Sequence, residues 1–268
     1  MTTKKLPPKA IGAIGVVAMF AAWWVLSLTV FANVGVGDTK AIPSPIQVAS
    51  GYAESGFQFY WRNFSVTINE AAQGYLWGCG LALLFAGLVL LVPKLEALVM
   101  QLAVITYCIP IVAIGPLVLI VLGPPPSGEP SGTAVFLAAL SVFFTTVVGS
   151  LLGLKSADRS SLDVVTVYGG SKFTQLRKVR LVAALPAILT ALQIAVPAAF
   201  LGAVLGEFFG KVEVGVGPAM LFAQQSLNSP RVWGLALVSG AVALIGYLVV
   251  GQLTRMAAPW AKGAEVSA

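Results

Sequence analysis

Six stretches of this chain run for more than 20 residues without a charged side chain. A helix needs about 20 apolar residues to cross the hydrocarbon core of a bilayer, so each stretch is long enough for one span. The sequence therefore predicts an all-α integral membrane protein with six transmembrane helices and both termini on the same side. The six stretches are Ala10–Gly37, Ala71–Pro93, Ala97–Gly128, Pro130–Leu154, Leu181–Gly206 and Val232–Thr254.

The composition excludes several other classes of protein. Charged residues make up 10% of the chain, against roughly 25% in an ordinary soluble domain. The mean hydropathy of +0.91 argues against both a soluble domain and a disordered chain. The chain has no His, which excludes an HExxH zinc site and any His-based catalytic triad. Its two cysteines, Cys79 and Cys108, lie in apolar stretches, so we expect no metal, no cofactor and no enzyme active site.

The distribution of Lys and Arg predicts the orientation in the membrane. With a cytoplasmic N-terminus, 12 of the 16 basic residues lie in inside segments, as the positive-inside rule requires. We therefore expect a multi-pass protein of the cell (inner) membrane with both termini cytoplasmic. The net charge of +6 is then a topology signal, and no nucleic-acid partner is expected. The apolar run in Met1–Phe31 is too long for a signal peptide, which favours an uncleaved first span.

The predicted organisation has a large membrane core between two short tails. We expect a short amphipathic helix from about Gln47 to Gly56 in the long outside segment, after a turn at Pro43–Pro45. The predicted parts are a cytoplasmic tail at 1–9, the first transmembrane helix at 10–31, the outside segment at 32–70, a five-helix membrane core at 71–254 with cytoplasmic helices at 158–180, and a cytoplasmic tail at 255–268.

The longest cytoplasmic connection, Lys155–Arg180, predicts two short helices around a hinge at Gly169-Gly170. Asp158 or Ser160 can cap the first helix, and Ser171 can cap the second. A projecting helix pair with a narrow apolar stripe suits docking into a groove of a partner protein, but it equally suits binding to anionic membrane lipid. The pattern leaves both readings open. The stripe comprises Leu162, Val165 and Tyr168 on the first helix and Phe173, Leu176 and Val179 on the second.

Three short motifs keep a fixed spacing in and after this segment. They are Asp163-Val164-Val165, then Gly169-Gly170, then Leu181-Val182-Ala183-Ala184-Leu185-Pro186. This arrangement resembles the coupling signature of ABC importer permeases, E-A-A-x-x-x-G-A followed about a dozen residues later by L-P. The ending is similar to L-P-A-A-L-P in the nitrate/sulfonate/taurine/bicarbonate subgroup of binding-protein-dependent permeases. The spacing is intact, although Asp replaces Glu, both Ala are Val, and Val182 replaces the first Pro.

Other stretches resemble the same subgroup in the same order, from about Ile42 to Arg255. They are Ile42-Pro43-Ser44-Pro45, the run from Ile109 through Pro110, Gly115 and Pro116 to Gly123, and Ala203–Glu207 followed by Gly215-Val216-Gly217.

Two departures from the subgroup stand out. The subgroup usually has Arg where this chain has Glu70, and it usually has an Asn in the fourth span near Gly149. These differences bear on substrate and partner geometry more than on the fold. Glu70-Ala71-Ala72 also spells the coupling motif literally, but Gly74 comes two residues early and the topology places Glu70 at the outer face. We interpret that match as coincidence.

The resemblance implies a type I ABC importer permease fold and a subunit that works as a pair. Each permease would bind one cytoplasmic ABC ATPase subunit through the Asp163–Val179 helices, and a separate extracytoplasmic solute-binding protein would deliver the substrate. The chain has no GxxxxGK[ST] loop, so ATP would be bound by the partner. Asp163 could cap or brace the first helix and Gly169 would permit the turn, unless both are ordinary turn residues. The coupling residues implied are Asp163, Val164, Val165, Gly169, Gly170, Leu185 and Pro186.

The degenerate coupling motif suggests that the second permease of the pair is either a second copy of this chain or a paralogous permease with a better-preserved motif. The translocation path should be lined by small and kinking residues, because Pro permits a bend in a spanning helix. Close packing of helices through small residues explains the same pattern equally well. Glu207 lies at the outer end of its span, where an interfacial role is expected. The candidates are Pro110, Gly115 and Pro116 on the third span, and Pro197, Gly202, Gly206 and Glu207 on the fifth.

The function expected is therefore transport of a small solute of the nitrate, sulfonate/taurine, bicarbonate or vitamin-precursor class. Two alternatives remain. An ion-coupled secondary transporter or channel usually has ionisable groups near mid-membrane, and the six predicted spans hold no clear one. A substrate-binding membrane component of another ATP-driven importer would not need the spacing from Asp163 to Pro186.

Overall fold

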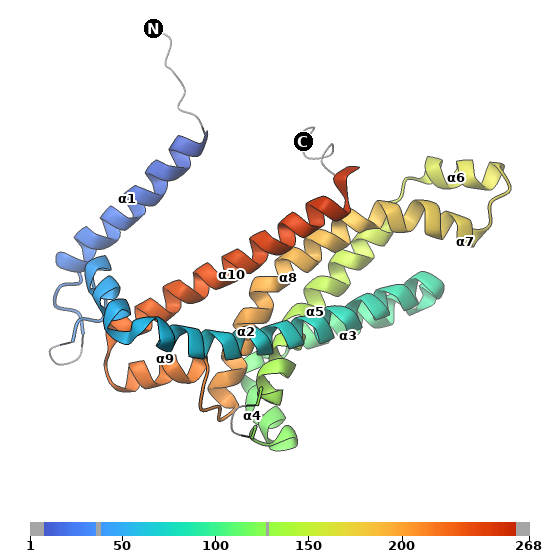
Figure 1. Cartoon of the computed structure of the whole chain (residues 1–268). Helices are drawn as coiled ribbons and strands as arrows, with labels where there is room; N and C mark the ends of the chain where they lie inside the picture. Colours follow the sequence, from blue (N-terminus) through green and yellow to red (C-terminus); the bar gives the residue numbers. More distant parts are fainter. Residues whose placement is uncertain (1–7, 36–38, 127–128, 261–268) are drawn as a thin grey trace, which may run out of the picture. The chain divides into compact units, whose positions relative to one another are not determined.

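The computed structural model describes residues 8–35, 39–126 and 129–260, and all regular elements in these ranges are helices. Most of the two predicted tails lies outside the described residues. The helices are α1 (Pro8–Leu28), α2 (Pro45–Leu91), η1 (Pro93–Leu95), α3 (Glu96–Cys108), α4 (Ile111–Leu122), α5 (Gly132–Lys155), α6 (Arg159–Val167), α7 (Lys172–Gln175), η2 (Leu176–Arg180), α8 (Leu181–Phe209), α9 (Val216–Gln225) and α10 (Ser229–Ala257) (Figure 1).

Five helices among the described residues are long and apolar enough to cross a membrane. The predicted third span, Ala97–Gly128, is not a straight helix. It consists of α3 and α4, which meet at an angle of 94°, so the count rises to six only if this bent pair is one span. The break lies at Ile109-Pro110, because proline has no N–H to continue the helix and pushes Ile109 into an extended conformation (ψ 124°).

Helix α2 is longer than the sequence predicted. The segment at 32–70 was expected to lie outside the membrane with one short helix, but α2 begins at Pro45 and continues to Leu91. Its start is a capping box, in which Ser44 N–H donates to Gln47 Oε1 (2.9 Å) and Gln47 N–H donates to Ser44 Oγ (3.3 Å). Gly56 interrupts the helix with φ 76° and ψ 154°, at the end predicted for the short helix.

The chain divides into two compact units, of which the first comprises the described part of Met1–Arg62 and Ala219–Ser239. Aromatic contacts hold this unit together. Trp23 stacks on Trp233 with ring centroids 5.4 Å apart, and Trp233 Nε1 donates to the carbonyl of Ala41 (3.1 Å). These two tryptophans therefore pack inside the unit.

The second unit, Asn63–Pro218 with Gly240–Ala268, is built around α5. Three Gly-x-x-x-Gly pairs form its closest helix contacts, because glycine allows two backbones to approach. Figure 1 shows α5 and α8 running side by side. Gly74 and Gly78 of α2 face Ala138, Ala139 and Val142 of α5, Gly149 and Gly153 of α5 face Ala184, Ala187 and Ala191 of α8, and Gly202 and Gly206 of α8 face Ala134, Leu137 and Ala138 of α5.

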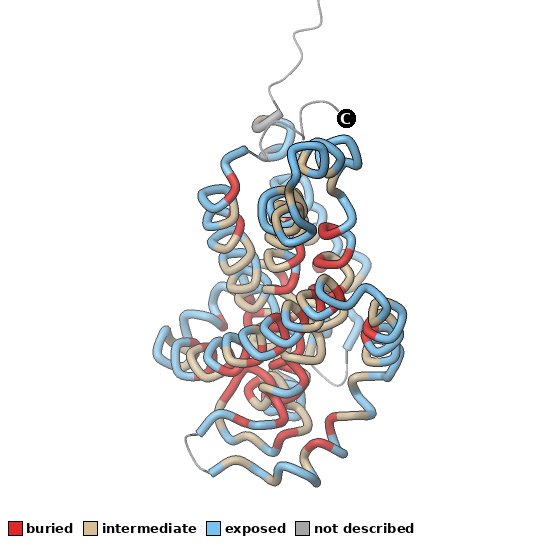
Figure 2. The backbone as a smooth tube through the Cα atoms, turned by 90° about the vertical axis from the view of Figure 1, so that its right-hand side faces the viewer, coloured by how far each residue is buried: buried red, intermediate tan, exposed pale blue. Residues whose placement is uncertain are grey.

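Two polar contacts of the second unit lie at opposite ends of α5. At one end, Lys155 Nζ and Glu96 Oε1 form an ion pair (2.5 Å) that joins α5 to the start of α3. At the other end, Glu70 and Ser131 are in contact through a hydrogen bond. Between the two ends, two clusters of buried small and apolar side chains lie among the helices, and Figure 2 shows buried segments within the helix packing. The residues predicted to share a membrane side thus lie together.

Candidate functional site

The segment between α5 and α8 forms a projecting hairpin, as the sequence predicted. Helix α6 ends in a Schellman motif, in which Gly170 N–H donates to Val165 O (2.8 Å) and Gly169 N–H donates to Thr166 O (2.9 Å). Gly169 has φ 75°, a left-handed conformation that glycine adopts without strain. The two helices therefore meet in a turn at Gly169-Gly170, where the sequence predicted a break, and local turn chemistry accounts for it.

Of the helix caps predicted for the hairpin, the one at Ser171 forms and the one at Asp158 does not. Ser171 caps α7, because its Oγ accepts a hydrogen bond from Thr174 N–H (3.3 Å). Asp158 occupies the N-cap position of α6 but makes no side-chain capping hydrogen bond. It accepts a hydrogen bond from the Ser160 hydroxyl, which holds the pKa of Asp158 below its ordinary value. Asp163 lies exposed in the middle of α6, so the expectation that it caps this helix is wrong.

A side chain that the sequence did not single out joins the two arms of the hairpin. Gln175 Nε2 donates to the carbonyl of Leu162 (3.0 Å) and to Thr166 Oγ1 (2.7 Å), both on α6. The spacing of Gln175 from its partners, 13 and 9 residues across a turn, carries no periodic signal in the sequence. This amide fixes how α6 lies against the second arm.

The tip of the hairpin exposes apolar side chains to water. The predicted stripe divides, since Leu162 and Val165 are half-buried between the arms whereas Tyr168 points outward. Exposed apolar side chains that lie together mark interaction surfaces more often than isolated ones do. The exposed apolar residues, called the hairpin tip below, are Val164 (55% exposed), Val167 (83%), Tyr168 (86%) and Phe173 (67%).

The second arm of the hairpin is continuous with the next membrane helix. Helix α7, the π-helical segment η2 and α8 form one helix of 38 residues from Lys172 to Phe209. At a rise of 1.5 Å per residue, such a helix is about 57 Å long. Leu185 and Pro186 lie half-buried within it, just after η2. The hairpin is therefore connected to the opposite end of α8 by one uninterrupted helix.

That opposite end holds two buried carboxyl groups. Glu207 Oε1 accepts a hydrogen bond from Thr67 Oγ1 (2.5 Å), and Glu207 Oε2 accepts one from Gly217 N–H (2.6 Å). Glu70 Oε1 accepts from Ser131 N–H at the start of α5 (2.6 Å). The sequence placed both glutamates at the outer face, but nothing in it indicated that they meet.

The turn before α9 approaches these carboxyl groups closely. Thr67 Oγ1 accepts a hydrogen bond from Val216 N–H (2.9 Å), and Asn63 Oδ1 accepts one from Gly215 N–H (3.1 Å). A Cβ added at Gly215 would lie 2.5 Å from Glu207 Oε1 and 2.6 Å from Glu207 Cδ. The pattern Glu207 with Gly215-Val216-Gly217 is thus one structural unit, in which the glycines make room for the carboxyl group.

The residues proposed to line a translocation path have mixed positions in the single chain. Gly202 and Gly206 are buried against α5, and Gly115 is buried against Phe209. Pro197 is half-buried, while Pro110 and Pro116 are exposed. Close packing, the alternative explanation, describes the contacts of the three glycines. Their contribution to a path stays a prediction.

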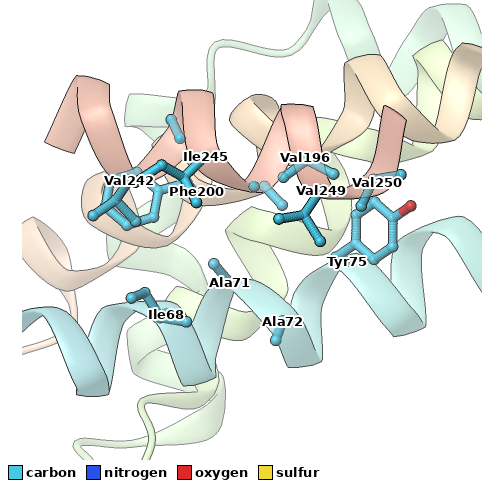
Figure 3. Close-up of a pocket in the computed structure, with 13 residues that line it drawn as sticks. Ile68, Ala71, Ala72, Tyr75, Val196, Phe200, Val242, Ile245, Val249 and Val250 are labelled. Atoms are coloured by element: carbon cyan, nitrogen blue, oxygen red, sulfur yellow. The ribbon is translucent and has the colours of Figure 1, made fainter. Parts of the chain in front are cut away.

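An apolar cavity of about 350 Å³ lies alongside α8, between α2 and α10 (Figure 3). Tyr75 and Phe200 present aromatic rings to it, and Ile245 and Val249 of α10 close the opposite side. Tyr75 Oη donates to the carbonyl of Leu192 (3.1 Å), which fixes the ring against α8. No charged residue lines this cavity within the described chain, so it suits an apolar group or ring rather than an ion.

These helices and the projecting hairpin define a multi-pass membrane transport protein. The chain belongs to the family described as binding-protein-dependent transport system inner membrane component, whose model matches residues 74–262. It is therefore a permease of the ABC transporter class, as the resemblance in the sequence implied.

Three relatives fit this assignment. A probable ABC transporter permease protein of Haemophilus influenzae is 28% identical over 83% of this chain and 88% of its own length. The formylaminopyrimidine transport permease protein ThiX of Halalkalibacterium halodurans is 25% identical over 85% and 88%. The putative aliphatic sulfonates transport permease protein SsuC of Bacillus subtilis is 27% identical over 88% and 79%.

Proposed function

We propose that this chain is the translocation subunit of an ATP-driven importer and that its α6–α7 hairpin docks on a cytoplasmic ATPase subunit. The observation that carries the proposal is the continuous helix from Lys172 to Phe209, which joins the hairpin tip to the outer end of α8. Shifting a two-state equilibrium from 1:99 to 99:1 takes about 5.5 kcal/mol, so the coupling contact has to be mechanically firm. The Schellman turn and the Gln175 hydrogen bonds supply that firmness.

The hairpin tip favours a protein groove over a lipid surface. Val167 and Tyr168 lie at the turn and point away from both arms, whereas Lys172 and Lys178 are exposed along the second arm. A helix bound flat to lipid needs its apolar side chains in a line along its length. A cluster at the tip fits insertion end-on into a cleft.

Co-purification of the ATPase subunit with tagged permease from native membranes tests the docking. We expect Tyr168→Asp and Phe173→Asp to lose the ATPase, because each places a charge in the apolar contact. The matched control Ser161→Asp adds the same charge to the first turn of α6, where an acidic residue favours the helix, and should retain the ATPase. Retention by both tip variants, or no ATPase with wild type, would contradict the proposal.

We propose that the cargo is a small organic solute within the range that the relatives' names span, from a formylaminopyrimidine to aliphatic sulfonates. A solute-binding protein outside the membrane would deliver it. Uptake into vesicles loaded with ATP, compared with uptake driven by an ion gradient alone, separates this function from that of a secondary transporter. Uptake that needs no ATP would reject the importer mechanism.

The second permease of the pair is proposed to be a different chain. The motivating feature is the loss of Glu, both Ala and the first Pro from the coupling motif, with Asp163, Val164, Val165 and Val182 in their places. Mass spectrometry of the purified complex should then show two permease species. A single species would indicate a pair of identical subunits.

A further inference from the structure

The carboxyl groups of Glu70 and Glu207 meet in the interior of the second unit. Glu70 is fully buried and Glu207 is 2% exposed. Thr67, one turn before Glu70 on α2, donates a hydrogen bond to Glu207. Ser131, which donates to Glu70, lies against Gly210 just after α8, so the two carboxyl groups meet at the same point between the helices. An ionised carboxylate only accepts hydrogen bonds, so this contact is favourable only when one of the two groups carries a proton.

The hydrogen bonds to the four carboxyl oxygens leave one place for that proton. Three oxygens accept from protein donors, namely both oxygens of Glu207 and Oε1 of Glu70. Glu70 Oε2 is buried and has no hydrogen-bond partner among the described residues. Buried polar atoms are nearly always satisfied, so an orphaned oxygen beside a second carboxyl group indicates a missing donor.

The charges around the pair also indicate one bound proton. The N-termini of α5 and α9 both point at it, through Ser131 N–H and Gly217 N–H. Each helix N-terminus is equivalent to about half a positive charge, so together they offset about one of two negative charges. One bound proton neutralises the second negative charge.

Three charged residues lie on the two loops that flank the pair, one between α4 and α5 and one between α8 and α9. Lys211 and Glu213, between α8 and α9, are exposed and line a separate hollow with Glu129. The remaining partners, Thr67 and Asn63 of α2, do not titrate.

We propose that Glu70 and Glu207 share one proton, and that the protonated pair is a latch holding the turn before α9 against α2, α5 and α8. The proton lies between Glu70 Oε2 and Glu207, so the pair as a whole keeps a single negative charge. When the proton leaves to water, two charges face one another and the turn at Gly215–Gly217 loosens. The role of this latch in transport rests on the proposed function, whereas the shared proton does not.

Infrared spectroscopy of the purified full-length chain in lipid nanodiscs tests the proton directly, because a protonated carboxyl group absorbs apart from carboxylates. We expect wild type at neutral pH to show this band and to lose it in alkali. Glu70→Gln should lack the band, since its amide supplies the missing donor without a proton. The matched control Glu213→Gln makes the same change on an exposed side chain of the neighbouring loop and should keep the band.

Thermal unfolding against pH provides a second measurement. The folded pair holds a proton that separate carboxyl groups of the unfolded chain release below neutral pH. The folded state then binds more protons, so stability falls as pH rises through the titration of the pair. The unfolding midpoint of wild type and of Glu213→Gln should shift downward from neutral to alkaline pH, and that of Glu70→Gln should not.

Three outcomes would overturn the shared proton. They are absence of the band in wild type at neutral pH, its survival in both Glu70→Gln and Glu207→Gln, and an unfolding midpoint with the same pH dependence in wild type and Glu70→Gln. Should Glu70→Gln fail to fold, Glu207→Gln and the wild-type titration carry the test. ATP-driven uptake by sealed membrane vesicles that contain the wild-type importer separates the two proposals, because its absence rejects the proposed function and leaves the infrared result unchanged.

Discussion

At the scale of single residues, glycines decide how closely α5 approaches its neighbours. A Cβ at Gly206 would lie 2.9 Å from Ala134 N and Thr133 O, which are backbone atoms that cannot move aside easily. A Cβ at Gly80, also in a membrane helix, would meet nothing within 4 Å. The same residue type is thus essential to packing at one site and replaceable at another.

Gly206→Val should therefore destabilise the chain by about 1–3 kcal/mol, the usual cost of overpacking. Gly80→Val is the matched control and should change stability by no more than about 0.5 kcal/mol, as exposed substitutions usually do. Thermal unfolding in detergent measures both. If Gly206→Val unfolds like wild type but blocks uptake, the residue lines the translocation path and packing is not its main role.

The sequence predicted the role of a residue where that role depends on its near neighbours along the chain. Ser171 and Gly169 were predicted because caps and turns depend on neighbours only a few residues away. The contact between Glu70 and Glu207 was not predicted, since it joins residues 137 positions apart (207 − 70) and no local pattern encodes it. Each glutamate was noticed separately, one as a departure from the subgroup and one as an acid at the end of a span.

At the scale of elements, the hairpin is stiff because its arms are joined by side-chain hydrogen bonds as well as by the turn. Gln175→Leu removes the donor to Leu162 O and Thr166 Oγ1. Since water can reach α6, we expect a loss of about 1 kcal/mol, the typical net worth of a hydrogen bond, in the local stability of α6. Hydrogen exchange of the α6 amides should become faster.

Lys178→Leu provides the control for this prediction. It introduces the same leucine on an exposed position of the same arm. Exchange of α6 should stay at the wild-type rate. Equal rates in Gln175→Leu and wild type would mean that the turn alone holds the arms together.

Helix boundaries were predicted less well than helix existence. The sequence predicted one short helix, from about Gln47 to Gly56, in the outside segment at 32–70, but α2 continues from Pro45 to Leu91. The bend at Ile109-Pro110 divides a stretch whose apolar composition alone reads as one span. Composition reports burial in lipid, while the direction of the backbone depends on single prolines.

At the scale of the whole molecule, two contacts show which helix ends of the second unit lie together. Glu96 and Lys155 pair at one end, and Glu70 and Ser131 meet at the other. The positive-inside count predicts that the end with Glu96 and Lys155 faces the cytoplasm.

Thiol labelling of intact cells tests this orientation. In a chain with Cys79 and Cys108 replaced by Ala, Glu213→Cys should react with a membrane-impermeant reagent added outside. Ser161→Cys, on the hairpin, should react only after the membrane is opened. The reverse pattern would invert the topology and would place the hairpin on the wrong side for an ATPase.

The hairpin tip also has a consequence for the life of the protein before assembly. In a chain that has not yet bound a partner, Tyr168, Val167 and Phe173 are exposed. Exposed apolar clusters are the surfaces through which unassembled proteins aggregate, and chaperones and proteases continuously remove such molecules. The cellular amount of this subunit should therefore follow the supply of the partner that covers the tip, so that surplus copies are degraded and do not accumulate as idle pores.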